Sequence, residues 1–152
     1  MLAVAWPPTR WILLEANGRK GRFLTRAVRE LELEARVEVW IGRAEALGRE
    51  VERRASVDLV VARGFGPPAV TAECAAPFLA TGGRLAVSEP PGAEPDRWPA
   101  GPLAELGLRR LGVRGGVRGG VRDGRAAIMV FTQVSACPGR FPRRSPATRP
   151  LF

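Results

Sequence analysis

The chain has 152 residues, of which 45% are hydrophobic, so it is long enough for one domain with a core and too short for two ordinary ones. It carries 24 Lys and Arg against 15 Asp and Glu, a net charge of +9, and no histidine. The lack of histidine excludes Ser-His-Asp and Cys-His nucleophiles and most zinc sites, and we expect no metal. The basic charge favours a polyanionic partner, although an arginine-rich surface without a partner has the same composition.

Two cysteines, Cys74 and Cys137, are too few for a disulfide framework. The apolar stretch at residues 1–6 is stopped by Pro7 and Pro8 without a basic region before it. No apolar run approaches the roughly 18 residues of a membrane span. We therefore expect a cytoplasmic monomer that makes no membrane contact.

Four short runs rich in Val, Leu and Ile predict β-strands. They are Trp11–Glu15, Val37–Ile41, Val57–Ala62 and Arg84–Ser88. None alternates cleanly between apolar and polar residues, which is typical of strands covered on both faces in a parallel sheet. Helical segments are predicted between them, at residues 19–33, 42–54 and 66–83, the last from two prolines to Gly82 and Gly83. This order predicts an α/β fold with a mostly parallel sheet.

The C-terminal half continues with a Pro-rich loop, a short helical turn and two further strands. These are Pro90–Pro102, Leu103–Leu106, and the strands Leu108–Val113 and Ala126–Val134, which form an antiparallel hairpin. Residues 136–152 show no periodicity and are rich in Pro and Arg. We therefore predict a domain at 1–135 followed by a basic tail at 136–152.

The hairpin connection, Gly112–Arg125, repeats Gly-Val-Arg three times. It could be an RNA-binding tract that presents arginines to phosphates and bases. A solvated loop lengthened by repetition explains it equally simply, and three copies favour that interpretation.

Three strand ends carry candidate ligand-binding residues. In an open parallel sheet, ligands bind beyond the carboxyl ends of the strands. Glu15 ends the first strand, where a carboxylate is the usual partner of a ribose diol, although a solvated Glu before an Asn-Gly turn is as plausible there. Glu45 follows the second strand beside Gly42, and Arg63 follows the third, just before Phe65, which could stack on a flat base.

These segments together resemble one known family. The stretches WILLEANGRKGRFLTRAV, VEVWIGRAEAL and VDLVVARGFG, then GGRL and the ending GRFPRRSPATRPL, are similar to the GidB/RsmG family of bacterial 16S ribosomal RNA guanine-N7 methyltransferases. The resemblance covers essentially the whole chain. It implies a class I S-adenosylmethionine-dependent methyltransferase fold, a Rossmann-like three-layer sandwich.

The resemblance also implies roles for particular residues, although it names no catalytic residue. Glu15 would bind the ribose of S-adenosylmethionine, Ala44 and Glu45 would lie against the adenine, and Arg63 would line the cofactor and target-base pocket. Candidates for ribosomal RNA phosphate contacts come from the basic helix and the tail. They are Arg19, Lys20, Arg22, Arg140, Arg143 and Arg144.

The sequence departs from this family pattern at its beginning. Class I methyltransferases open with a strand and a Gly-rich loop, and no counterpart precedes Trp11 here. We expect a sheet that lacks its first strand, with open edges at the first and third predicted strands or a different pairing, and weak or no cofactor binding by these 152 residues.

Two other functions stay open at this point. One is a non-catalytic basic RNA-binding protein that uses the Gly-Val-Arg repeat and the arginine tail. The other is a nicotinamide dehydrogenase with Glu15 as the ribose ligand, which is the weakest because the chain has no G-x-G-x-x-G motif.

Overall fold

The computed structural model describes residues 2–90, 95–114, 117–118, 121–122 and 127–152. The chain forms two compact units, Met1–Leu47 and Gly48–Phe152, which are described separately below. None of the helices in the described ranges combines the length and apolar character that a bilayer crossing needs.

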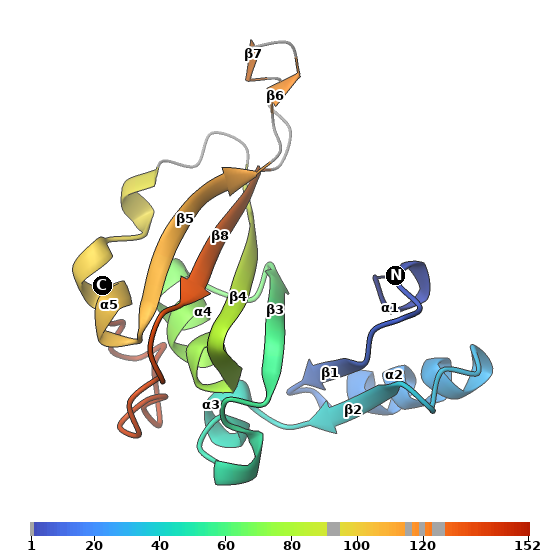
Figure 1. Cartoon of the computed structure of the whole chain (residues 1–152). Coiled ribbons are helices and arrows are strands. Elements are labelled where there is room, and N and C mark those ends of the chain that lie inside the picture. Colours follow the sequence, from blue (N-terminus) through green and yellow to red (C-terminus); the bar gives the residue numbers. More distant parts are fainter. Residues whose placement is uncertain (1, 91–94, 115–116, 119–120, 123–126) are drawn as a thin grey trace. The chain divides into compact units, whose positions relative to one another are not determined.

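The first unit is a two-stranded parallel sheet with helices around it (Figure 1). Its strands pair with Trp11 opposite Val37 and Glu15 opposite Ile41. Its elements in chain order are α1 (Leu2–Ala5), β1 (Trp11–Glu15), α2 (Gly18–Glu30), β2 (Val37–Ile41) and α3 (Ala44–Leu47). A small core joins α1, α2 and β2 through Ala3, Val28 and Val37.

Helix α2 begins at a well-formed cap. The Asn17 side-chain oxygen accepts the backbone N–H groups of Arg19 and Lys20 at 3.0 and 3.1 Å, which satisfies donors that a helix start leaves free. Gly21 then faces β2, where a Cβ atom would lie 2.6 Å from Cγ1 of Ile41. The glycine therefore allows α2 to approach the sheet closely.

The second unit is built on a four-stranded mixed sheet in the order β3-β4-β8-β5. Strands β3 and β4 are parallel, and β8 runs antiparallel to both β4 and β5, so three of the four strands share one direction. The elements of this unit are η1 (Val51–Arg53), β3 (Val57–Arg63), α4 (Pro68–Ala75), η2 (Ala76–Phe78), β4 (Leu79–Glu89), η3 (Pro95–Arg97), α5 (Ala100–Glu105), β5 (Leu108–Arg114), β6 (Val117–Arg118), β7 (Val121–Arg122) and β8 (Ala127–Gln133).

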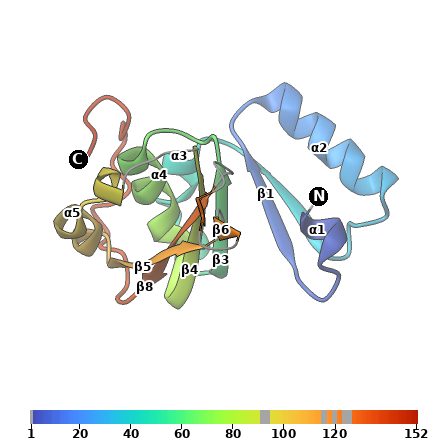
Figure 2. The same cartoon turned by 90° about the horizontal axis from the view of Figure 1, so that it is seen from above.

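Helices α4 and α5 and the C-terminal segment lie on one face of this sheet (Figure 2). The core on that face includes the fully buried Leu85 and Phe131 and the ring of Trp98, 4.7 Å from the Phe131 ring. Apolar side chains on the sheet strands are also exposed. They are Leu59, Val61, Leu111, Val113 and Ile128.

The α/β fold and the strand positions are confirmed, but two predicted helices are wrong in extent. The helix predicted at 66–83 ends as α4 at Ala75, with Pro77 in the following 3₁₀ turn, because proline lacks the N–H that continues a helix. Gly82 and Gly83 lie instead inside β4, where they form a bulge. The pairing with β3 jumps there from Val57–Leu79 to Leu59–Arg84.

The helix predicted at 42–54 is two short pieces, α3 and η1, with Gly48 between them. Glycine in a helix interior costs about 1 kcal/mol relative to alanine, and a helix this polar has little buried surface to offset that cost. The sequence pattern at residues 42–54 therefore predicted a longer helix than the chain forms.

The expectation that the strands are covered on both faces is wrong for β1 and β3. Every residue of β1 is only half-buried, and β3 exposes Leu59 and Val61. Both are edge strands, β1 paired with β2 and β3 with β4 among the described residues. Open edges at these two strands are what the sequence predicted, and they explain why these apolar strands are not fully buried.

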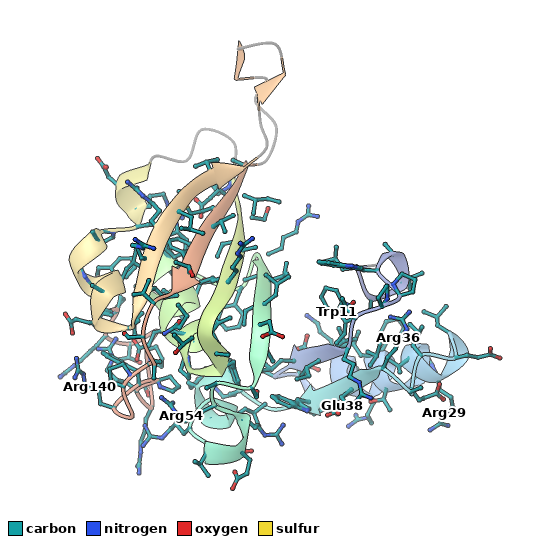
Figure 3. The ribbon with its side chains drawn as sticks, viewed as in Figure 1. Trp11, Arg29, Arg36, Glu38, Arg54 and Arg140 are labelled. Atoms are coloured by element: carbon teal, nitrogen blue, oxygen red, sulfur yellow. The ribbon has the colours of Figure 1, made fainter. Side chains whose placement is uncertain are left out.

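The C-terminal segment is held against the second unit. The Arg54 guanidinium donates to four backbone carbonyls, those of Gly48, Cys137, Pro138 and Phe141, at 2.7 to 3.2 Å (Figure 3). Leu151 and Phe152 pack against the core. The domain boundary at 135 stays a prediction, but residues 136–152 are not a detached tail.

The Gly-Val-Arg repeat is described only in part. The backbones of β6 and β7 pair antiparallel, and residues 115–116, 119–120 and 123–126 lie outside the described residues.

Candidate functional site

Glu15 ends β1 with its carboxylate beside a turn. Its Oε1 atom accepts the Asn17 backbone N–H at 2.8 Å, and its backbone carbonyl accepts the N–H of Gly42 at 2.9 Å. The residue is half-buried. An ionised carboxylate offers about four lone-pair positions, so the single bond to Asn17 leaves it able to accept ligand hydroxyls.

Ala44 and Glu45 open α3, two and three residues after Gly42. Ala44 is buried. The Glu45 carboxylate accepts a hydrogen bond from Nε of Arg43 at 2.5 Å, and the Glu45 side chain is 12% exposed. Because Gly42 is bonded to the end of β1, the structure brings Glu15 and the start of α3 together at one end of the two-stranded sheet. This is the grouping expected from the sequence for three of the four predicted cofactor residues.

The fourth, Arg63, is the last residue of β3 and belongs to the second unit. Strand alternation places it on the same face as the exposed Leu59 and Val61, and it is itself exposed. Its position in its own unit, at the carboxyl end of a parallel strand, is the one predicted.

The second unit has a small hollow beyond the ends of β3 and β4, which we call the strand-end hollow. Its volume is about 120 Å³, and its lining includes Phe65, Thr71, Ser88, Glu89, Arg97 and Trp98. Glu89 is 5% exposed. Its carboxylate accepts hydrogen bonds from Nη1 of Arg97 at 2.6 Å and from Nε1 of Trp98 at 3.0 Å. Phe65 is 49% exposed.

Sequence reasoning missed Glu89, Arg97 and Trp98 at this place. It treated residues 90–102 only as a Pro-rich loop. A signal was present in the stretch itself, since Glu89 ends an apolar strand and an Arg-Trp pair follows eight residues later. A buried carboxylate requires such partners, because an unpaired charge in a core is costly.

The predicted RNA-contact residues of the first unit gather on α2. Arg19, Lys20 and Arg22 are exposed and surround a shallow hollow with Phe23 and Arg26. The Arg26 guanidinium lies 5.9 Å from the centre of the Phe23 ring. Since the buried side of α2 is formed by Gly21 and Val28, the cations stand clear of the core.

The three predicted arginines of the C-terminal segment have different environments. Arg140 is exposed, with its guanidinium 4.8 Å from the Phe141 ring and 3.4 Å from Oε2 of Glu105. Figure 3 shows Arg140 at the surface of its unit. Arg143 is bound to the fully buried Glu73, and Arg144 is exposed. The structure therefore separates one internally paired arginine from two surface ones.

Metal binding finds no support in these side chains. Within the described ranges, no group of three His, Cys, Asp or Glu residues comes together in a way that could hold an ion.

Comparison with known proteins decides the family. The family model described as rRNA small subunit methyltransferase G matches residues 1–88, which include β1, α2, β2, β3 and the candidate residues Glu15, Ala44, Glu45 and Arg63. The chain belongs to the ribosomal RNA small subunit methyltransferase G family. The family resemblance found in the sequence is thereby confirmed.

Several relatives carry that family name, including two that match almost the whole of this chain. The protein from Rubrobacter xylanophilus is 33% identical over 99% of this chain and 59% of its own length. The protein from Deinococcus radiodurans is 35% identical over 99% of this chain and 60% of its own length. The chain thus spans about three fifths of the length of these curated relatives.

Solved methyltransferase structures have a similar fold. A structure of geranyl diphosphate methyltransferase in complex with SAM is 12% identical, with a TM-score of 0.60 over 88% of this chain and 72% of that one. At this identity the likeness concerns the fold alone. It confirms the class I, Rossmann-like α/β architecture.

Proposed function

We propose that this family member transfers a methyl group from S-adenosylmethionine to N7 of a guanine in 16S ribosomal RNA, in the cytoplasm. The observation that carries the proposal is the match of the family model to residues 1–88, together with Glu15 and the start of α3 lying at one sheet end. A non-catalytic RNA-binding role rests on the basic charge, the Gly-Val-Arg repeat and the arginine tail, and the comparisons do not favour it.

The carboxylate oxygens of Glu15 are hydrogen-bond acceptors that fit the ribose of the cofactor. A ribose diol donates two hydroxyl hydrogens, and the half-buried Glu15 carboxylate can accept both beside its bond to Asn17. Ala44 and Glu45 follow directly along the same sheet end, where they would lie against the adenine. The role of Arg63, which ends β3 in the second unit, stays a prediction from the family resemblance.

When bound, S-adenosylmethionine supplies an electrophilic methyl group on a sulfonium. Guanine N7 has a free lone pair, so it would accept this methyl group without a general base from the chain. The protein's contribution is to bind and orient the two reactants. A sequence without histidine is compatible with this chemistry.

The cations on α2 and in the C-terminal segment suit an RNA substrate. We propose that the exposed Arg19, Lys20 and Arg22 contact phosphates, because arginine and lysine side chains that neutralise phosphates provide most of the sequence-independent affinity. Arg140 and Arg144 would add contacts from the C-terminal segment. Arg143 would act indirectly, by fixing the segment through Glu73.

Equilibrium dialysis with labelled S-adenosylmethionine at concentrations up to millimolar tests the cofactor site. We expect Glu15→Ala to weaken binding at least about tenfold, the effect of losing hydrogen bonds to a charged group. Glu34→Ala removes the same charge from an exposed loop position of the same unit and should leave binding unchanged. Equal affinity of the Glu15→Ala variant and the unmodified chain would refute the assignment.

A further inference from the structure

The strand-end hollow contains a charged cluster that the cofactor residues do not use. Glu89 closes β4 with a side chain only 6% exposed, and it holds both Arg97 and Trp98. Trp98 is 2% exposed and belongs to the core of the unit. The carboxylate therefore ties the returning chain to the end of β4 at a fixed place.

Arg97 is the member of this cluster that can reach a ligand. A guanidinium carries five N–H donors in a rigid fork, and Nη1 is the atom bound to Oε2 of Glu89. The Arg97 side chain is 37% exposed and lines the hollow. One edge of the cation is thus anchored on a buried partner while the side chain remains open to solvent, which suits the binding of an anionic group.

The rest of the hollow suits a flat ring. Phe65 contributes a half-exposed aromatic surface from the turn after β3, and Val87 and Pro68 contribute apolar walls. At about 120 Å³ the hollow is well below the roughly 300–1,000 Å³ of pockets that enclose a drug-sized ligand. It can therefore hold one ring system and not a whole nucleoside cofactor. Aromatic side chains with nearby arginines bind unstacked bases of single-stranded nucleic acid.

We infer that the strand-end hollow binds one purine nucleotide of the RNA, with its base on Phe65 and its phosphate on Arg97, and that Glu89 is a positioning residue for Arg97. The inference rests on the proposed function, since it names where that substrate is held. Phe65 and Arg97 are specificity-determining residues in this account, and neither takes part in bond breaking.

The Trp98 indole N–H gives a direct reporter, because it lines the hollow and donates to Glu89. Its ¹⁵N–¹H signal can be assigned among the four tryptophans by its absence in Trp98→Phe. We expect guanosine 5′-monophosphate to shift this signal, and guanosine, which lacks the phosphate, to bind at least about tenfold more weakly. A short guanine-containing single-stranded RNA should shift the same signal at lower concentration.

Variants separate the roles of the three residues. Arg97→Ala should abolish the difference between nucleotide and nucleoside, and Arg97→Lys should restore only part of it, because an ammonium lacks the planar fork. Phe65→Leu should weaken binding of nucleoside and nucleotide equally. Glu89→Gln keeps an acceptor for Trp98 but removes the charge that fixes Arg97. It should therefore reduce the difference in affinity between nucleotide and nucleoside without abolishing it. Arg84→Ala, an exposed arginine earlier on β4, is the matched control and should change nothing.

The outcomes distinguish this inference from the proposed function. RNA binding that leaves the Trp98 signal unmoved, or an Arg97→Ala variant that keeps the preference for the phosphate, would overturn the inference and leave the methyltransferase proposal standing. Failure of the chain to bind RNA at any site would count against both. An Arg97→Ala variant that loses thermal stability while keeping its nucleotide affinity would assign Arg97 a structural role and overturn the inference as well.

Discussion

Arg143 binds the buried carboxylate of Glu73 with both its main chain and its side chain. The backbone N–H of Arg143 donates to Oε1 at 2.7 Å, and Nε and Nη2 of its guanidinium lie 2.9 and 2.5 Å from Oε1 and Oε2. Glu73 is fully buried on α4, and the side-chain hydrogen bonding that its carboxylate accepts from Arg143 raises the pKa of Arg143 above its ordinary value. This pair fastens the C-terminal segment to the helix layer.

Removing Arg143 should destabilise the fold strongly. Arg143→Ala leaves the Glu73 charge buried without its partner, and breaking such a pair costs about 3 to 5 kcal/mol. The neighbouring Arg144→Ala is the matched control, because Arg144 is exposed and such surface changes stay within about 0.5 kcal/mol. Urea unfolding followed by tryptophan fluorescence measures both variants. Equal stability of the two would show that the Glu73 pair contributes nothing.

For RNA binding the order should reverse: replacing Arg144 should weaken the affinity, and replacing Arg143 should not. Arg144→Ala should weaken association and lower the slope of log affinity against log salt by about 0.7, the value for one phosphate contact on a single strand. Arg143→Gln, assayed under conditions where it is folded, should leave that slope unchanged because Arg143 is committed to Glu73. Filter binding across a salt series decides this. A slope that falls for Arg143→Gln and not for Arg144→Ala would reverse the assignment.

Arg54 should be a second attachment of the C-terminal segment. Its guanidinium serves four backbone carbonyls, three of them in residues 137–141. Arg54→Ala should cost about 2 to 4 kcal/mol, because several partly buried acceptors lose their donor at once. Arg54→Lys should recover only part of this, since one ammonium cannot reproduce the fork. Limited proteolysis should cut the Arg54→Ala variant within residues 136–152 well before the unmodified chain; identical cleavage rates would argue against this attachment.

Cys137 gives the fold a dependence on alkaline pH. Burial raises the pKa of its thiol above the ordinary value of 9.0, and the nearby Arg54 guanidinium opposes that shift. Because the folded state holds the proton more tightly than the unfolded state, the stabilisation is complete below pH 9.0 and is lost as the pH rises toward the folded-state pKa. We expect unfolding experiments across this range to show a smaller decline for Cys137→Ala than for the unmodified chain. Parallel curves would contradict this.

The sequence predicted strands well because their apolar runs were dense and bounded by turn residues. Trp11–Glu15 and Val37–Ile41 match β1 and β2 residue for residue. It failed where two local signals competed. Gly82 and Gly83 suited a helix stop, but Pro77 had already ended α4, and the two glycines serve a bulge inside β4 instead.

The candidate site was predictable only in part, for a similar reason. Glu15 and Glu45 could be placed because they follow predicted strands directly. The partnership of Glu73 with Arg143, seventy residues apart along the chain, depends on tertiary packing and has no local pattern. The role of Glu89 likewise required knowing that Trp98 returns to the end of β4.

Labelled methyl transfer to 16S ribosomal RNA that lacks its natural N7 methylation tests the central claim most directly. Because we expect these 152 residues to bind the cofactor only weakly, the chain is incubated with millimolar labelled S-adenosylmethionine. The RNA is then digested and separated into nucleosides. We expect label in 7-methylguanosine, strongly reduced for Glu15→Ala and unchanged for Glu34→Ala. Label in a different nucleoside, no label in the RNA, or equal transfer by Glu15→Ala would contradict the claim.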